Sequence, residues 1–203
     1  MGATDPRTES VLAFWFGDGT DDAAILADKS ATWFSKDPAL DETIRERFGT
    51  LRESAVDGRL DAWLATPRGT LALIVLVDQF SRNLFRGDPR AFEHDALARS
   101  WTERMLDAGT DRELRRIERV FAYLPLEHSE SIADQDSCVA RFTALCDEAP
   151  ADLHDTFAGF LDYARRHRDI VARFGRFPHR NAVLGRTTTD AERAFLKEPG
   201  SSF

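Results

Sequence analysis

The chain has 203 residues, of which 42% are hydrophobic and 31% are charged, and its formal net charge is −8. This length is enough for one domain with a sizeable core, and the composition is ordinary for a soluble globular protein. An acidic chain repels a phosphate backbone, so the charge argues against general nucleic-acid binding. Local basic loops that bind a small anion remain compatible with it.

The two cysteines and the longest apolar run indicate where in the cell the protein is expected. Cys138 and Cys146 lie eight residues apart, which on one helix separates them by ~12 Å, too far for a disulfide. Two buried thiols in a reducing compartment are the simpler interpretation. The first ten residues show no signal peptide, and residues 71–77 are too few to span a bilayer. We therefore expect a cytoplasmic protein with no membrane partner.

The first third of the chain predicts two features. Residues 11–16 form an apolar run that ends at Gly17, and an irregular stretch follows with the aromatic pair at 33–34 as an anchor. Proline fits a first helical turn, so a helix is predicted to begin at Pro38 and to end at Gly58. Apolar residues recur at helical spacing along it: Leu40, Ile44, Phe48, Leu51 and Ala55.

Residues 71–77 are the one ambiguous segment of the middle third. Their composition alone would allow a buried strand, but no partner strand is visible elsewhere, so we predict a buried helix. The next helix is expected to begin at Pro89 and to close at Gly109. The helix after it is expected to stop at Pro125, because proline disrupts a helix interior.

The last third predicts three more helices. One carries both cysteines and ends before Pro150, and the longest spans residues 153–174. A short final helix begins at Thr189, which forms a capping box with Glu192. The stripe of the longest helix is Leu153, Phe157, Phe160, Ala164, His167, Val171 and Phe174. The whole chain, residues 1–203, is thus predicted to be one all-α domain of seven to eight helices packed as antiparallel hairpins.

Three polar clusters follow the predicted helix ends. Residues 78–86 follow the apolar run, residues 127–130 follow Pro125, and residues 167–181 surround the break after the longest helix. Arginines and histidines are concentrated in these segments of an otherwise acidic chain. The pattern predicts a polar site built from three helix-end loops, although it does not name a reaction.

The same segments carry a resemblance. Residues 78–87, 123–130 and 167–181, together with 11–17 and 199–203, resemble the signatures of the domain of unknown function 924 family. The resemblance covers nearly the whole chain, and it implies a helical fold similar to tetratricopeptide-repeat proteins. It implies no reaction. Ser81 departs from the family pattern, which usually has proline there.

The catalytic candidates are His167, His179, Glu127 and Glu130. His167 lies on an apolar helical stripe, where a histidine is either a structural residue with a satisfied ring or a general base. In the catalytic interpretation the two histidines handle protons and the two glutamates orient them. A Ser-His-carboxylate triad at Ser129 is poorly supported, because no Gly-x-Ser-x-Gly motif surrounds it.

The ligand-binding candidates are mostly arginines, whose forked guanidinium groups suit phosphate and carboxylate. The set comprises Arg82, Asn83, Arg86, His128, Arg176, Arg180 and Asn181. The alternative is that these arginines pair with nearby carboxylates and only hold the loops together. No His-x₃-His or Cys-x₂-Cys pair occurs, so no zinc site is expected, and no cofactor is identified.

Two hypotheses follow. In the first, the loops form a pocket for a small anionic ligand bearing phosphate or carboxylate, and the protein is possibly an enzyme. In the second, the chain is a non-enzymatic helical-repeat scaffold that presents a groove to a peptide or protein, and the polar clusters are structural. Convergence of the three loops on one pocket would favour the first.

Overall fold

The computed structural model describes residues 5–33 and 35–202, and every regular element within them is helical. The all-α prediction is therefore confirmed. The α-helices are α1 (Pro6–Phe16), α2 (Asp22–Trp33), α3 (Pro38–Val56), α4 (Pro67–Ile74), α5 (Phe80–Leu84), α6 (Asp95–Asp107), α7 (Arg116–Glu127), α8 (Ile132–Asp147), α9 (His154–Phe174) and α10 (Asp190–Phe195). The 3-10 turns are η1 (Asp61–Ala65), η3 (Pro89–Ala91), η4 (Thr110–Glu113) and η5 (Pro178–Arg180).

The buried run at residues 71–77 is helical, as predicted, and forms the axis of the fold. It belongs to α4 and to the π-helical segment η2 (Val75–Gln79), which continues directly into α5. All of its side chains are buried, and α1, α6 and α7 pack against α4. Aromatic rings fill the space around this axis: the ring of Trp15 lies 5.4 Å from that of Phe80 and 5.7 Å from that of Phe121.

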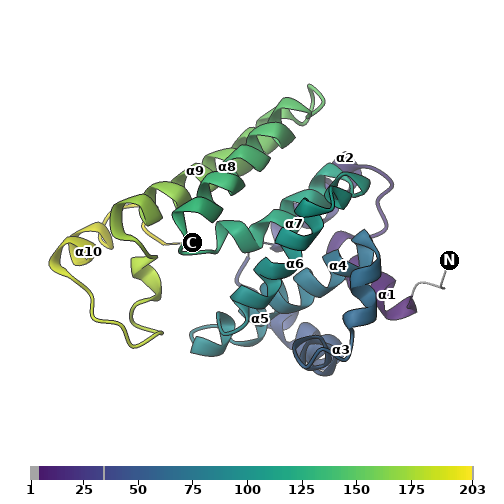
Figure 1. Cartoon of the computed structure of the whole chain (residues 1–203), viewed down its shortest axis with the longest axis horizontal. Helices are drawn as coiled ribbons and strands as arrows, with labels where there is room; N and C mark the ends of the chain where they lie inside the picture. The colour runs from purple at the N-terminus through teal and green to yellow at the C-terminus, as the bar shows by residue number, and fades with distance from the viewer. Residues whose placement is uncertain (1–4, 34, 203) are drawn as a thin grey trace.

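Helix α8 and helix α9 form a long hairpin beside this core, and α10 lies at the far end of α9 (Figure 1). A small second core joins the end of α9 to α10 through Ile170, Val171, Phe177 and Phe195. Gly175 ends α9 in the left-handed region, with φ of 69°, which glycine adopts without steric cost. The turn after Gly175 sends the chain back towards the core.

The predicted caps are present. Asp37 accepts a hydrogen bond from the backbone N–H of Ala39, directly before the α3 proline. At α10 the capping box is complete: Thr189 Oγ1 accepts from Glu192 N at 3.2 Å, and Glu192 Oε2 accepts from Thr189 N at 2.7 Å. These side chains satisfy N–H groups that have no partner within the helix itself.

Three predicted boundaries were wrong. Helix α2 occupies the stretch expected to be irregular, because Ile25, Leu26 and Trp33 are buried against the core; Phe34 lies outside the described residues. Helix α6 begins only at Asp95, after the short turn η3.

The third wrong boundary is the end of α7. This helix continues through Pro125 to Glu127. Proline removes one backbone donor and costs ~3 kcal/mol inside a helix. Every residue from Val120 to Glu127 is buried, and the burial of these side chains offsets that cost.

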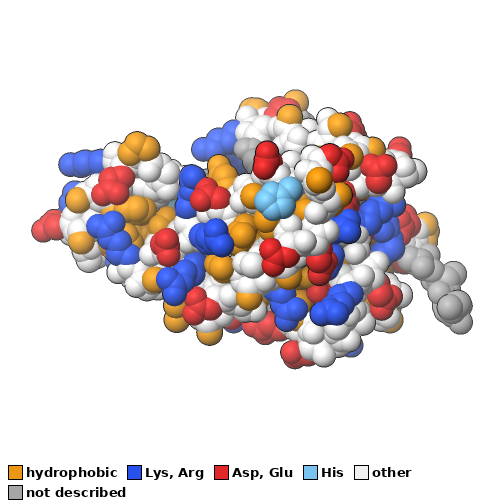
Figure 2. All heavy atoms as spheres, turned by 90° about the horizontal axis from the view of Figure 1, so that it is seen from above, with side chains coloured by type: hydrophobic (Ala, Val, Ile, Leu, Met, Phe, Trp, Pro, Cys, Tyr) orange, Lys and Arg blue, Asp and Glu red, His pale blue; other side chains and the backbone are white. Residues whose placement is uncertain are grey.

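The surface mixes charges of both signs. In the face seen from above, blue and red side chains are interspersed among hydrophobic ones rather than gathered into a patch of one sign (Figure 2). Within the described residues, no helix is both long and apolar enough to cross a membrane.

Candidate functional site

Segments from three distant parts of the sequence meet beside the end of η2. Asp78 Oδ1 lies 2.8 Å from His128 Nδ1, at the turn between α7 and α8. The His128 carbonyl accepts a hydrogen bond of 3.0 Å from Arg180 Nη1, in the loop after α9. The N–H of Phe177, in the same loop, donates to Glu130 Oε1 at 2.8 Å. The three helix-end loops of the sequence hypothesis therefore contact one another.

Asp78 is a fully buried carboxylate at the centre of this meeting point. Burial alone would raise its pKa. The charges of Arg82 and His128, with hydrogen bonds from His128 and Gln79, outweigh that effect and hold the pKa of Asp78 well below its ordinary range. Asp78 is therefore ionised, and since it can only accept, His128 Nδ1 carries the proton between them.

Arg82 is saturated with partners. Its Nη1 and Nη2 atoms each donate to one oxygen of Asp95 at 3.0 Å, and Nη1 also donates to the Asp78 carbonyl at 2.9 Å. Burial disfavours its charge, but Asp78 and Asp95 together raise the pKa of Arg82 above its usual value. This paired set of Asp78, Arg82 and Asp95 ties η2 and α5 to the start of α6.

Arg180 is buried but poorly compensated. Only 7% of its side chain is exposed, and its closest carboxylate, Asp95, lies 3.7 Å away and already binds Arg82. Its guanidinium lies over the rings of Phe92 and Phe177, 4.8 and 4.5 Å from their centroids. Its buried Nε has no hydrogen-bond partner among the described residues. Burial and the neighbouring Arg82 charge lower the pKa of Arg180 to about 10.

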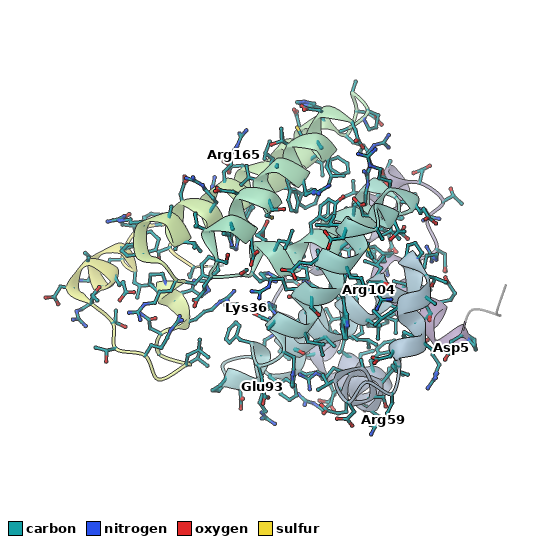
Figure 3. The ribbon with its side chains drawn as sticks, in the orientation of Figure 1. Asp5, Lys36, Arg59, Glu93, Arg104 and Arg165 are labelled. Atoms are coloured by element: carbon teal, nitrogen blue, oxygen red, sulfur yellow. The ribbon has the colours of Figure 1, made fainter. Side chains whose placement is uncertain are left out.

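A cleft of about 580 Å³ opens beside Arg180; we call it the Arg180 cleft. Its lining residues come from η3, α6, the α7–α8 turn and the loop after α9: Pro89, Arg90, Phe92, Glu93, Asp95, Ala96, Arg99, Ser129, Glu130, Arg180 and Leu184. Glu93 lies between η3 and α6, on the side facing the C-terminal loop, whereas Arg165 projects from the outer side of the α8–α9 hairpin (Figure 3). The volume is typical of a small-molecule site.

A buried carboxyl and imidazole, Glu127 and His167, lie near Arg180 but are not among the lining residues of the cleft. His167 Nδ1 is 2.9 Å from the Tyr163 carbonyl and 3.6 Å from Glu127 Oε1. A carbonyl only accepts, so Nδ1 carries the proton. Burial lowers the pKa of His167 to about 3, whereas burial and the Asp78 charge raise the pKa of Glu127 to about 8. Both groups are therefore largely uncharged near neutrality.

Glu127, one of the two carboxylates expected beside His167, lies within ion-pair distance of its ring, and the Tyr163 carbonyl also accepts from Nδ1. The other two candidate histidines lie nearby. Burial and Arg180 lower the pKa of His179 to about 4, and burial and Arg82 lower the pKa of His128.

Glu130 binds an arginine of the C-terminal loop. It receives two hydrogen bonds from Arg186, at 2.7 and 3.0 Å, besides the one from Phe177 N. These partners outweigh burial and lower the pKa of Glu130. Glu130 therefore holds the C-terminal loop against the α7–α8 turn, and it also lines the cleft.

Several predicted ligand-binding residues are engaged elsewhere. Arg86 and Asn83 both bind Asp41 of α3, at 2.5 and 2.8 Å. Arg176 forms a two-pronged pair with Glu192 of α10, at 2.6 and 2.9 Å. Asn181 Nδ2 donates to Thr188 Oγ1 at 3.4 Å. The partners of these residues lie outside the motifs. The spacing within each motif therefore could not show that these residues bind away from the cleft.

Sequence reasoning also missed two residues of the site. Asp95 binds Arg82 and lies 3.7 Å from Arg180, yet in the sequence it is one acid among several inside a helix that was predicted to begin at Pro89. Phe92 lies under both guanidinium groups, 5.7 Å from that of Arg82, and nothing in its local pattern marks it. In the part of the chain that the structure describes, no group of three or more His, Cys, Asp or Glu residues is arranged to hold a metal ion.

Comparison with known proteins places the chain in a family. The model described as "Bacterial protein of unknown function (DUF924)" matches residues 11–200, so the chain belongs to this family. A solved structure, that of the protein of unknown function ATU0120 from Agrobacterium tumefaciens, is similar, with 36% sequence identity and a TM-score of 0.81. The match covers 96% of this chain and 99% of that one. No curated protein matches the chain.

Proposed function

We propose that the protein binds a small anionic ligand in the Arg180 cleft. The supporting observation is the electrostatic state of Arg180, which is buried at the cleft wall and shares its nearest carboxylate with Arg82. A buried charge that is only partly paired raises the free energy of the folded protein. An anion that binds beside the charge lowers this free energy, so the site favours anion binding. An anionic ligand would supply the missing partner.

Two helix starts border the cleft. Asp95, Ala96 and Arg99 belong to the first turns of α6, and Ser129 and Glu130 lie just before the N-cap of α8, Ser131. The N-terminal end of a helix carries a partial positive charge and unpaired N–H groups, which attract anions. The face seen in Figure 2 mixes charges of both signs, and the net charge of the chain is −8, which argues for a small ligand over a nucleic acid.

A thermal-shift screen with phosphorylated and carboxylated metabolites tests the proposal. A ligand at 100 times its Kd stabilises the folded state by about 2.7 kcal/mol, which for a chain of this size corresponds to a rise in Tm of roughly 5–10 °C. Arg180→Met should abolish this rise. Arg165→Met, which removes one exposed charge outside the cleft, should keep it. The proposal fails if no anion raises the Tm, or if Arg180→Met responds like the wild type.

A catalytic role for the buried groups is a second proposal, favoured by the proximity of Glu127 and His167. A carboxyl that keeps its proton and a neutral imidazole provide a donor and an acceptor close to pH 7. His179 borders the same loop, and Glu130 would position the ligand from the cleft wall. His167→Gln should then bind the ligand found in the screen with unchanged affinity but fail to turn it over. A fully active variant would remove His167 from the catalytic set.

The rival is a non-enzymatic scaffold for a peptide or protein. It is favoured by the complete pairing of Arg82, Arg86, Arg176 and Arg186 with carboxylates, since such pairs hold loops together without a ligand. The screen separates the two proposals. A scaffold without an anion site is not stabilised by a small anion, so its Tm should stay the same with every metabolite.

A further inference from the structure

We infer that the ligand of the Arg180 cleft is a monocarboxylate with an apolar aliphatic or aryl body, rather than a phosphate ester. This inference rests on the proposed anion site and specifies its chemistry. It follows from the edge of Arg180 whose Nε has no protein partner, from the charges along the cleft and from the apolar residues of its lining.

The edge of Arg180 that carries the buried, unpaired Nε matches a single carboxylate. Both contacts of its guanidinium, to the His128 carbonyl and to Asp95, use Nη1. The opposite edge consists of Nε and Nη2, and Nε has no hydrogen-bond partner within residues 5–33 and 35–202. Two parallel N–H groups on one edge fit the two oxygens of a carboxylate.

The same chain uses this edge repeatedly for carboxylates. Arg68 donates from Nε and Nη2 to Glu9 at 2.9 and 2.7 Å. Arg176 donates from the same two atoms to Glu192 at 2.6 and 2.9 Å. Arg180 presents the equivalent edge from a more buried position than either of these arginines. A ligand carboxylate would complete the arrangement already found at these pairs.

The charges along the cleft favour a single negative charge. Arg99 is paired with Glu103 and Asp134, each at 3.3 Å, and Arg90 with Asp88 at 2.9 Å. Three carboxylates, Glu93, Asp95 and Glu130, also line the cleft. A phosphate dianion would meet their repulsion with one guanidinium edge to compensate it, whereas a carboxylate carries half that charge.

The rest of the lining suits an apolar body. Pro89, Phe92, Ala96 and Leu184 contribute hydrocarbon surface, and the Phe92 ring lies directly under the Arg180 guanidinium. A ligand with its carboxylate on Arg180 would therefore place its body against these residues. Each Å² of apolar surface that it buries contributes about 25 cal/mol.

Calorimetric titration of the full chain with four probes tests the inference: phenylacetate, hexanoate, phenyl phosphate and phenylacetamide. We expect phenylacetate and hexanoate to bind at least about tenfold more tightly than phenyl phosphate, and phenylacetamide not to bind. Arg180→Met should lower the affinity for phenylacetate by about 100-fold, because it removes a charge-assisted pair of hydrogen bonds. Arg165→Met is the matched control and should bind like the wild type.

Arg180→Lys serves as a second variant, and replaces Arg180→Met if that chain does not fold. Lysine keeps the positive charge but cannot form the two parallel hydrogen bonds of a guanidinium group. The affinity for phenylacetate should therefore fall by about tenfold. Binding of phenyl phosphate in preference to the carboxylates, with dependence on Arg180, would overturn the inference and leave the anion site standing. Phenylacetate binding that is equal in wild type and both Arg180 variants would overturn both. The absence of binding by every probe overturns the carboxylate class, while the metabolite screen decides the anion site separately.

Discussion

Two clefts of similar volume differ in how their arginines are compensated. The Arg180 cleft measures about 580 Å³. A second cleft of about 600 Å³ lies at the opposite end of α7, where Arg115, Arg116 and Arg119 meet residues 20–23 and the α8–α9 turn. Each cleft is lined by three arginines, so their number does not choose between the two clefts. By burial and pairing the second cleft is the weaker candidate for an anion.

The arginines of the second cleft differ from Arg180 in pairing or in exposure, although the buried Nε atoms of Arg116 and Arg119 also have no hydrogen-bond partner among the described residues. Arg119 Nη2 donates to Glu148 at 2.7 Å, and Arg115 Nη1 donates to the Gly19 carbonyl at 2.8 Å. Arg116 has only a 3.5 Å contact with Asp22, but 38% of its side chain is exposed. Arg180 has no carboxylate of its own, and only 7% of its side chain is exposed. The comparison teaches that compensation, rather than the count of arginines, marks an anion site.

The largest effect is expected at Arg82, the fully paired arginine next to Asp95. Arg82→Met would leave the buried Asp78 and the partly buried Asp95 without their main cationic partner, so the free energy of unfolding should fall by about 3–5 kcal/mol. Urea denaturation measures it, with Arg165→Met as a control that should match the wild type. A loss smaller than that of Arg180→Met would contradict the distinction between the two arginines.

Glu127→Gln should change the pH dependence of the free energy of unfolding. The pKa of Glu127 rises from 4.5 to about 8, so between these values the folded chain holds a proton that the unfolded chain has released. The free energy of unfolding therefore falls as pH rises through this window, by up to about 1.4 kcal/mol per pH unit. This contribution is fully present below pH 4.5 and lost above about pH 8.

The two histidines have the opposite effect on the pH dependence of the free energy of unfolding, and they act at lower pH. The pKa of His167 falls from 6.5 to about 3, and that of His179 to about 4, so their contribution is present above pH 6.5 and lost on acidification. The effect of Glu127 should thus be clearest between pH 6.5 and 8. Urea midpoints measured across that range should slope downward in the wild type and less in Glu127→Gln. Equal slopes would show that Glu127 is not the buried acid.

Arg180→Met should affect stability less than Arg82→Met. Replacing a poorly paired buried cation with an apolar side chain of similar length removes an unfavourable burial, and Asp95 keeps Arg82 as its partner. We expect a change in the free energy of unfolding within about 1 kcal/mol of zero, in either direction. A loss equal to that of Arg82→Met would make Arg180 a structural residue and would weaken the ligand proposal.

The smallest effect is expected in the second cleft. Arg116→Met removes an exposed charge with one weak contact, so the free energy of unfolding should change by about 0.5 kcal/mol or less. The rise in Tm caused by any anion found in the screen should stay as in the wild type. A reduced rise in this variant would move the anion site to the second cleft.

Local patterns predicted the helices that depend on local chemistry. The capping box at Thr189 and the left-handed Gly175 were visible as short motifs, and residues 71–77 were assigned to a helix because no partner strand was present. The extension of α7 through Pro125 was not predictable in this way, since it depends on burial against helices that are distant in sequence. The same holds for α2, whose buried face lies on the core.

The site followed a similar division. Charge balance alone predicted that basic loops would meet acidic ones, and the contacts among Asp78, His128, Glu130 and Arg180 agree with it. The choice of partner was beyond the sequence, because Asp41 and Glu192 take Arg86 and Arg176 through tertiary proximity. Asp95 gave no signal at all, since an acid in a first helical turn is also explained by the helix dipole.

The π-helical segment η2 sets the direction, around the helix axis, in which the side chains of the site point relative to the buried side chains of α4. A π turn accommodates one more residue than an α turn, and each residue of an α-helix advances the chain by about 100°. Asp78 lies within this turn and Arg82 one turn beyond it. If all of these residues were wound as a continuous α-helix, the extra residue would rotate Arg82 by about 100° away from Asp95. The π turn takes up that residue, so the winding of this buried run, and not only its composition, sets the direction of the site.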